Sequence, residues 1–323
     1  RFLCKHKSVL GSSYTQKGRS GFRGKGSCLL YRKGEKQMQP LELYIHIPFC
    51  VKKCAYCDFL SGPAGEKEKE EYVKMLVDEI RNCPDTVQNY RVISIFFGGG
   101  TPSLLTGEQI GRLMDTVREI FTLDEDAEIT MEMNPGTVTE EKLRKYRQAG
   151  VNRLSIGLQS VNDEELRLLG RIHTYEEFRE AYHLARTNGF SNINVDLISA
   201  IPGQTVESWR RTLEQVMALS PEHISAYSLI LEEGTTFYKK YVEDEAKEGP
   251  KLPDEDAERQ MYWDTETLME KNGYHRYEIS NYAKEGYACR HNLGYWERIP
   301  YLGFGIGAAS LVPGDLILSL IHI

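Results

Sequence analysis

One stretch decides the fold: Tyr44-Ile-His-Ile-Pro-Phe-Cys50-Val-Lys-Lys-Cys54-Ala-Tyr-Cys57-Asp-Phe59. Its three cysteines stand at the spacing C-x3-C-x2-C, on one loop that follows a short β-like run at residues 43–47. Pro48 ends that strand, because proline cannot donate to a sheet ladder. Thiolates are soft ligands, so three of them on a short loop favour an iron–sulfur cluster or zinc. A cubane cluster with three protein ligands keeps one iron open, so the loop is predicted to be catalytic.

Two other interpretations of the cysteines compete with a cluster. A structural zinc ion takes four protein ligands, and His46 is the nearby residue that would supply a fourth. A disulfide framework is typical of secreted chains with an even cysteine set, whereas this chain has 7 cysteines. Cys4, Cys28, Cys83 and Cys289 are isolated from the loop, a pattern that fits a reducing cytoplasm.

Composition excludes some classes of function. The chain has 323 residues, 41% of them hydrophobic, and a formal net charge of −7, which argues against a nucleic-acid binder. No apolar run approaches the roughly 20 residues that span a bilayer, so no transmembrane segment is predicted. Peripheral contact with a membrane stays open.

The charge is unevenly spread along the chain. Residues 1–40 carry ten Lys and Arg and one acidic residue, a net of +9, while the remainder carries 30 basic and 46 acidic residues, a net of −16. Residues 1–40 are predicted to be a disordered basic segment. A transit peptide and a nucleic-acid arm are alternatives. Residues 311–323 are apolar without a helix or strand pattern, and they are interpreted as an unplaced, truncated or foreign tail.

From residue 41 onward, strand-like and helical patterns alternate. Six strand-like runs, each followed by a helical stretch, are predicted at 43–47, 92–97, 128–133, 153–158, 193–198 and 224–230. Repeated crossovers imply a parallel sheet. Six units are fewer than the eight of a closed barrel. The sequence therefore predicts an α/β fold, a partial (β/α)6 barrel over residues 41–232, with an incomplete C-terminal extension over 233–310.

Polar and glycine residues follow the ends of the predicted strands. Beyond the cysteine loop, they are the Gly-Gly-Gly-Thr run at 98–101, Glu132, Gln159 and Asp196. Functional residues of β/α barrels lie at the C-terminal ends of strands, so these residues predict a site on one rim, above an interior of Val, Ile and Leu. Taken singly, each has an ordinary explanation, such as a turn or a hydrogen-bonded core polar group.

The cysteine stretch resembles a known superfamily. C-x3-C-x2-C after a first barrel strand, with Tyr56 before the last cysteine, is similar to the radical S-adenosylmethionine (SAM) superfamily. The longer sequence from Tyr44 to Phe59 resembles the oxygen-independent coproporphyrinogen oxidase group and, within it, the HemW-type heme chaperones. The resemblance covers about residues 41–310. This resemblance implies a [4Fe-4S] cluster, SAM and heme. The implied cluster ligands are Cys50, Cys54 and Cys57.

The same resemblance implies the cofactor chemistry. SAM would chelate the open iron, and one electron from the cluster would cleave its sulfonium to a 5′-deoxyadenosyl radical. Glycines let backbone groups approach the methionine end closely. The implied SAM contacts are Tyr44, Tyr56, Gly100, Thr101, Glu132, Gln159, Arg171 and Asp196. Without the resemblance, Arg171 would be interpreted as a surface ion pair.

Two positions in the sequence distinguish the coproporphyrinogen oxidases from the HemW-type chaperones. Oxidases of this type carry a fourth cysteine two residues after the third, and here that residue is Phe59. Residues 291–296, His-Asn-Leu-Gly-Tyr-Trp, match the H-N-x-x-Y-W motif of the chaperones. Histidine is a common axial ligand of heme iron, so the resemblance implies that His291 binds heme. A packed core histidine is the alternative.

The function expected from the sequence is that of a cytoplasmic radical SAM protein that binds heme and delivers it to acceptor hemoproteins. Its partners would be heme, those acceptors and an electron donor, and no nucleic acid. The first alternative is an oxygen-independent coproporphyrinogen III oxidase. The second is a non-catalytic module that uses the cysteine loop to bind a metal such as zinc. Members of the family continue into a smaller C-terminal domain.

Overall fold

The structure is a computed structural model that describes residues 38–244 and 248–313. The described residues form one compact unit. Most of the predicted basic segment and residues 314–323 of the predicted tail lie outside the described residues. The first strand begins at Gln39, before the predicted start of the barrel at residue 41, and Gln39 pairs with Tyr90.

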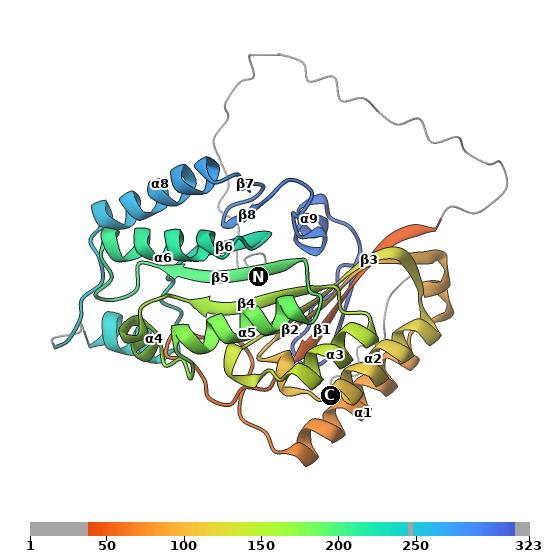
Figure 1. Cartoon of the computed structure of the whole chain (residues 1–323). Helices are drawn as coiled ribbons and strands as arrows, with labels where there is room; N and C mark the ends of the chain where they lie inside the picture. Colours follow the sequence, from red (N-terminus) through yellow and green to blue (C-terminus); the bar gives the residue numbers. More distant parts are fainter. Residues whose placement is uncertain (1–37, 245–247, 314–323) are drawn as a thin grey trace, which may run out of the picture. The chain divides into compact units, whose positions relative to one another are not determined.

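One curved sheet organises the described residues (Figure 1). Its nine strands follow the order β7-β8-β6-β5-β4-β3-β2-β1-β9, and the neighbours from β1 to β6 are all parallel. The predicted α/β fold with six parallel units, a partial barrel, is therefore confirmed. The strands are β1 (Gln39–Ile47), β2 (Tyr90–Gly99), β3 (Thr122–Met133), β4 (Arg153–Gln159), β5 (Ile193–Ser199), β6 (His223–Ser228), β7 (His275–Arg276), β8 (Asn281–Ala283) and β9 (Tyr301–Phe304).

Helices connect the parallel strands and cover the outer face of the sheet (Figure 1). Local signals define their ends: Thr106 and Gln109 form the predicted capping box of α2, and Gly150, at φ 105°, closes α3. The α-helices are α1 (Glu66–Arg81), α2 (Gly107–Ile120), α3 (Glu140–Ala149), α4 (Asp163–Leu169), α5 (Tyr175–Thr187), α6 (Val206–Ala218), α7 (Thr236–Tyr238), α8 (Glu255–Lys271) and α9 (Arg290–Glu297). The 3₁₀ helices are η2 (Asp85–Asn89), η3 (Pro102–Leu104) and η4 (Pro135–Thr137), and η5 (Lys239–Glu243) is a π-helix.

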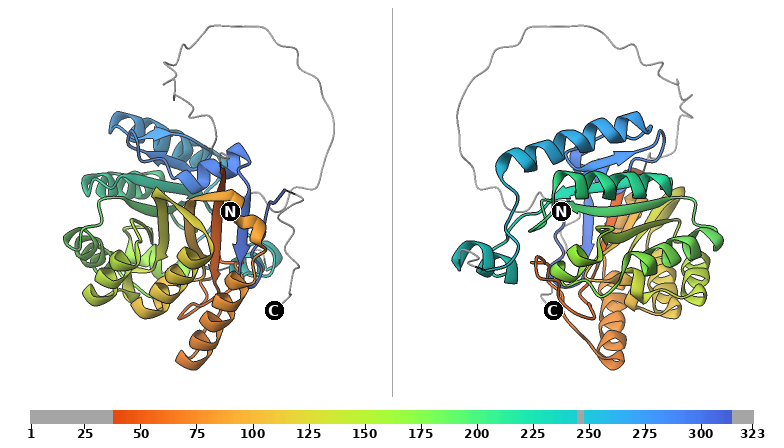
Figure 2. Two further views of the ribbon diagram at one scale, coloured as in Figure 1. Left: turned by 90° about the vertical axis from the view of Figure 1, so that its right-hand side faces the viewer. Right: turned by 60° about the vertical axis from the view of Figure 1, so that its left-hand side comes forward.

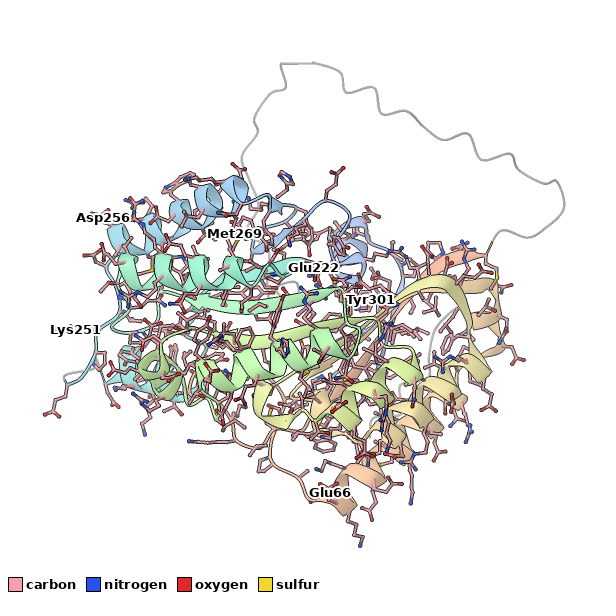
Figure 3. The ribbon with its side chains drawn as sticks, in the orientation of Figure 1. Glu66, Glu222, Lys251, Asp256, Met269 and Tyr301 are labelled. Carbon is pink, nitrogen blue, oxygen red and sulfur yellow. The ribbon has the colours of Figure 1, made fainter. Side chains whose placement is uncertain are left out.

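Strand β9 is an edge that the sequence did not predict. It pairs in parallel with β1, and Figure 2 shows the two side by side. Tyr301, labelled in Figure 3, is the Cα partner of Glu42. Gly303 of this strand allows a close approach of two backbone segments. A Cβ at Gly303 would lie 2.2 Å from the carbonyl oxygen of Ala309, because the chain folds back and Leu311 pairs with Tyr301.

The inner face of the sheet is polar, so the predicted Val, Ile and Leu interior is wrong. Alternate residues of a strand point to opposite faces. Leu41 and Leu43 of β1 join a hydrophobic cluster with Leu76 of α1, while Glu42 between them accepts a hydrogen bond from Ser94 of β2. The inward residues that hydrogen-bond across strands are Glu42, Ser94, Ser155, Asn194, Asp196, His223 and Ser225. The aliphatic side chains therefore pack outward against the helices.

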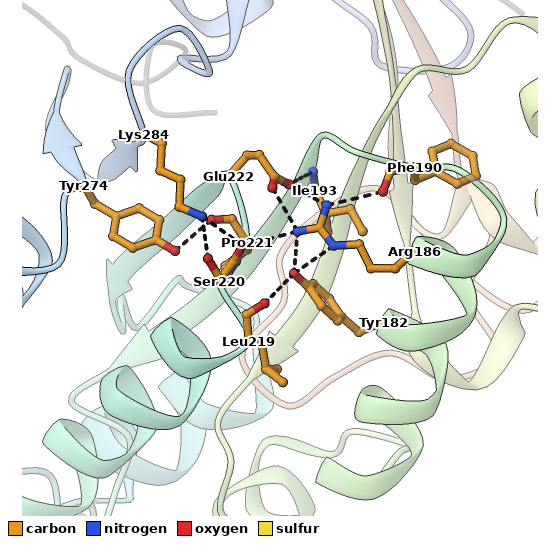
Figure 4. A network of polar contacts seen from close by, with 10 residues as sticks. All are labelled: Tyr182, Arg186, Phe190, Ile193, Leu219, Ser220, Pro221, Glu222, Tyr274 and Lys284. Atoms are coloured by element: carbon orange, nitrogen blue, oxygen red, sulfur yellow. Dashed lines mark hydrogen bonds and ion pairs between the residues drawn. The ribbon is translucent and has the colours of Figure 1, made fainter.

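A polar network joins the hairpin of β7 and β8 to the barrel (Figure 4). Arg186 of α5 lies 2.7 Å from Glu222, and it donates to the Tyr182 hydroxyl at 2.6 Å. Lys284, just after β8, donates to the Ser220 carbonyl oxygen at 2.9 Å. These contacts join α5, the α6–β6 turn and the hairpin at the N-terminal ends of the strands.

Candidate cluster and cofactor site

The glycine run after β2 supports the base of the cysteine loop (residues 48–62). Gly100 N donates to the Ile47 carbonyl oxygen at 2.8 Å, and Thr101 N donates to that of Phe49 at 2.7 Å. The Thr101 hydroxyl lies 3.5 Å from the sulfur of Cys50. A Cβ at Gly100 would lie 2.6 Å from the Phe49 carbonyl oxygen, so this position requires glycine. The run thus holds the backbone that carries the first cysteine.

The middle of the cysteine loop is held by elements that are distant in sequence. Ala55 N donates to the Leu169 carbonyl oxygen at the end of α4, and Phe237 N of α7 donates to the Ala55 carbonyl oxygen, both at 2.9 Å. Gly170, at φ 77°, brings the chain against the loop, since a Cβ there would lie 3.4 Å from Ala55 N. Sequence analysis missed the role of α7, because a three-residue helix leaves no periodic signal.

Arg171 links the cysteine loop to the C-terminal end of β4. Its Nη1 donates to the sulfur of Cys54 at 3.7 Å, and its Nη2 donates to the Gly157 carbonyl oxygen at 2.6 Å. Its buried Nε has no hydrogen-bond partner among the described residues. A Cβ at Gly157 would meet both the Gln159 amide at 3.0 Å and the Arg171 guanidinium at 3.2 Å. The surface ion pair considered for Arg171 is therefore wrong, because the guanidinium lies inside the site.

Burial and charge set the protonation of two groups here. Burial raises the pKa of Tyr56 well above its usual range, although the nearby Arg171 opposes this. Burial lowers the pKa of Arg171, but Tyr56 and Cys54 more than offset this, so its pKa is raised. Arg171 is therefore a cation at neutral pH and Tyr56 is a neutral phenol. The site holds a fixed positive charge next to the cysteine loop.

Gln159 and Glu132 lie at neighbouring strand ends. Gln159 is buried and has a φ of 76°, a left-handed conformation that few residues other than glycine adopt. Such strain is concentrated at functional sites. Glu132 Oε2 accepts from Gly99 N at 3.1 Å, and Gly99 packs so closely on His46 that a Cβ would lie 2.5 Å from its ring. Both predicted side chains therefore belong to the rim.

Tyr44 and Asp196 point inward beneath the rim. The Tyr44 hydroxyl lies 3.2 Å from His46 Nδ1, and His46 Nε2 lies 3.0 Å from the Leu60 carbonyl oxygen in the cysteine loop. Asp196 accepts from Ser155 at 3.0 Å and is the Cα partner of Gly157 on β4. His46 was considered as a zinc ligand, but its Nε2 contacts the backbone of the loop and its Nδ1 contacts Tyr44. The alternation in β1 is the signal that places Tyr44 and His46 on one face.

The loop supplies three thiols, the ligand type of an iron–sulfur cluster. Cys50, Cys54 and Cys57 are half-buried, and no cysteine of the described residues forms a disulfide. Within the described ranges, no three His, Cys, Asp or Glu side chains are grouped so as to hold a single metal ion. The unpartnered Nε of Arg171 offers a donor for the carboxylate of an amino acid-like cofactor.

Comparisons with known proteins agree with this geometry. Residues 44–216 match the Radical SAM superfamily. The chain is 44% identical to the heme chaperone HemW of Escherichia coli over 85% of this chain and 71% of that protein, and 41% identical to HemW of Haemophilus influenzae over 84% and 70%. The chain belongs to the HemW family of the radical SAM superfamily. Membership in the superfamily implies a [4Fe-4S] cluster and SAM.

One solved structure is also similar. It is coproporphyrinogen III oxidase (HemN) from E. coli, a radical SAM enzyme, with a TM-score of 0.74 and 29% identity over 85% of this chain. This chain spans 65% of the oxidase chain. No helix in the part of the chain that the structure describes is long and apolar enough to cross a membrane.

The HemW-type motif lies at the opposite end of the barrel, on α9. His291 is 1% exposed, and its ring stacks on Phe96 at a centroid distance of 5.2 Å. Its Nδ1 lies 2.8 Å from the Ser94 hydroxyl and its Nε2 lies 3.0 Å from the Tyr295 hydroxyl. We call the group Glu42, Ser94, His291 and Tyr295 the floor. Glu42 and Ile47 lie five residues apart on β1, so the floor and the rim are roughly 16 Å apart.

The floor is a neutral hydrogen-bonded chain. Ser94 donates to Glu42 Oε1 at 2.9 Å, so His291 Nδ1 must donate to Ser94 and Tyr295 must donate to Nε2. Burial raises the pKa of Glu42 to about 8 and lowers the pKa of His291 to about 3. The 4.0 Å approach of His291 to Glu42 is therefore not an ion pair. Both ring nitrogens of His291 are occupied within the protein.

Proposed function

We propose that this chain is a heme chaperone that binds heme and delivers it to acceptor hemoproteins in the cytoplasm. The observation that carries the proposal is 44% identity to the E. coli heme chaperone over 85% of this chain. Phe59, at the position of the oxidases' fourth cysteine, and the H-N-x-x-Y-W helix support the same choice over the oxidase.

The residues proposed to bind the cofactors lie at the rim. Cys50, Cys54 and Cys57 would bind the [4Fe-4S] cluster, which supplies one electron to SAM when both are bound. Arg171 would use its Nε to orient the SAM carboxylate, since that donor has no partner among residues 38–244 and 248–313. The strained Gln159 would place its amide beside the same group. The other proposed SAM contacts are Tyr44, Tyr56, Gly100, Thr101, Glu132 and Asp196.

His291 is proposed as the heme ligand in a different arrangement of α9. Heme iron needs an imidazole nitrogen with a free lone pair. In this structure the accepting nitrogen, Nε2, is occupied by Tyr295, and His291 is 1% exposed. Ligation therefore requires α9 to release that contact and move away from Ser94. Trp296, which is 48% exposed on the same helix, would then be available to pack on the porphyrin.

A second candidate function is the oxidative decarboxylation of coproporphyrinogen III. The observation that favours it is the TM-score of 0.74 with the E. coli oxidase. Phe59 argues against it.

The two candidates are separated by anaerobic turnover with coproporphyrinogen III, SAM and a chemical reductant. The E. coli oxidase serves as the positive control, and mass spectrometry follows the loss of carboxyl groups from the porphyrinogen. We expect decarboxylated product with the oxidase and none with this chain. Product formation by this chain, at a rate near that of the control, would establish the oxidase instead. Iron, sulfide and zinc analysis of the same sample tests the metal-binding alternative.

A further inference from the structure

Arg171 makes one contact that binding a cofactor carboxylate does not require. Its Nη1 donates to the sulfur of Cys54, while Nη2 is fixed on the Gly157 carbonyl oxygen. The Nε that would serve a carboxylate is a separate donor, without a partner among the described residues. The guanidinium therefore has a second role toward the cysteine sulfur.

The surrounding fold holds this contact in place. Leu169, two residues before Arg171, accepts a hydrogen bond from Ala55, the residue after Cys54. Gly170 lies against the same backbone, with its Cβ position 3.7 Å from the Cys54 Cα. The end of α4 thus carries Arg171 to the cysteine loop along two backbone contacts. The missing side chain of Gly157 leaves space for the guanidinium on the other side.

A cationic donor on a ligand sulfur has a defined effect on a cluster. Hydrogen bonds and positive charge near the sulfurs stabilise the reduced form, which carries one more negative charge. The low dielectric of a buried site strengthens both effects. Arginine keeps its charge at any accessible pH, and its planar fork holds two acceptors in a fixed geometry, whereas the donors of lysine all leave from one nitrogen at the end of a flexible chain.

We propose that Arg171 is a positioning residue that bonds the sulfur of Cys54 and raises the reduction potential of the cluster on that loop. The inference rests on the proposed cluster ligands and goes beyond them, because it gives Arg171 a role before SAM binds. It also names Cys54 as the ligand whose sulfur is tuned, whereas Cys50 faces the neutral hydroxyl of Thr101.

The test measures the reduction potential in the absence of SAM. Wild type, Arg171→Gln, Arg171→Lys and the control Arg167→Gln are reconstituted anaerobically, and EPR follows the reduced cluster in a redox titration. Arg167 lies on α4, its side chain is 69% exposed, and it pairs with Glu164 at 4.0 Å, so it controls for loss of a nearby charge. Iron and sulfide content is measured first in every sample.

We expect Arg171→Gln to lower the equilibrium constant for reduction about tenfold, which is about 59 mV for one electron. Arg171→Lys should recover part of this, because the charge remains while one of the two contacts is lost. Arg167→Gln should match wild type. A loaded Arg171→Lys protein with the wild-type potential, together with an unchanged Arg171→Gln, would overturn the proposal. Absence of iron and sulfide in wild type would instead refute the proposed cluster site.

Discussion

The rim and the floor both contain buried polar side chains, but these side chains are arranged differently at the two ends of the barrel. At the rim, Arg171 keeps a buried donor that has no partner within the described ranges, and Gln159 holds a strained backbone. At the floor, Ser94, His291 and Tyr295 form a chain of hydrogen bonds that ends on Glu42 Oε1, while Glu42 Oε2 has no hydrogen-bond partner among the described residues. Backbone strain is costly, and it is concentrated at functional sites. The comparison indicates that the rim, with its cationic donor and strained backbone, is the end arranged for cofactors, whereas the floor joins α9 to β1 and β2.

The largest expected effect is the loss of cluster assembly when a proposed ligand at the rim is replaced. Cys54→Ser should abolish cluster assembly, because three thiolates on one loop are the proposed ligands. Cys83→Ser should leave assembly intact, since Cys83 follows α1 and lies outside the loop. Iron and sulfide analysis after anaerobic reconstitution measures both, with about four of each per chain expected in wild type. An equal loss in the two variants would contradict the assignment.

The next effect concerns how the rim is supported. Gly100→Ala places a Cβ 2.6 Å from the Phe49 carbonyl oxygen, so it should displace the base of the cysteine loop and reduce cluster content as well as SAM affinity. Gly111→Ala on α2 is the matched control, because no atom lies within 4 Å of its Cβ position. Iron content and calorimetric titration with SAM provide the measurements. Full loading of the Gly100→Ala protein would show that the loop tolerates this shift.

A floor substitution should affect stability and spare the cluster. A Cβ at Gly294 of α9 would lie 2.1 Å from Glu42 Oε1, so Gly294→Ala should cost about 3 kcal/mol through overpacking. Cluster content should stay at the wild-type level, because the floor is roughly 16 Å from the rim. Urea unfolding gives the free energy, and iron analysis gives the loading. Loss of both together would mean that the two ends are not independent.

The smallest expected effect is a pH dependence of the floor. Glu42 has a folded-state pKa of about 8 against an ordinary value of 4.5, so its folded form keeps a proton that the unfolded chain releases. Its contribution to stability is complete below the ordinary value and is lost as pH rises toward 8. Glu42→Gln cannot ionise, so its unfolding free energy relative to wild type should rise by about 1.4 kcal/mol between about pH 6 and pH 7. A constant difference would show that Glu42 is ionised in the folded state.

Local signals were sufficient to predict the β/α units. The capping boxes at Thr106 and Thr174 and the left-handed Gly150 stand where their motifs predict helix ends. Strand β3 begins at Thr122, six residues before the predicted start at residue 128. In the structure Asp124 pairs with Arg91 at 3.0 Å and continues the strand.

The site was predicted where it depended on strand ends and was missed where it depended on tertiary contacts. The cysteine loop and Glu132 follow strands, so the parallel topology alone gathers them. The support of Ala55 by Leu169 and Phe237 joins residues more than a hundred positions apart, and no local pattern records it. The burial of His291 depends on its contacts with Ser94 and Phe96 of β2, which lie almost two hundred residues earlier in the sequence.

The central claim is that this chain binds heme, and a heme titration of the anaerobically reconstituted protein tests it most directly. Wild type should show a saturable Soret shift, His291→Ala should bind more weakly, and Tyr295→Phe should bind more tightly because it releases Nε2 of His291. Cluster absorbance should be the same in all three. Unchanged affinity in both variants would remove His291 as the ligand, and a wild-type protein without a saturable Soret shift would contradict the chaperone function itself.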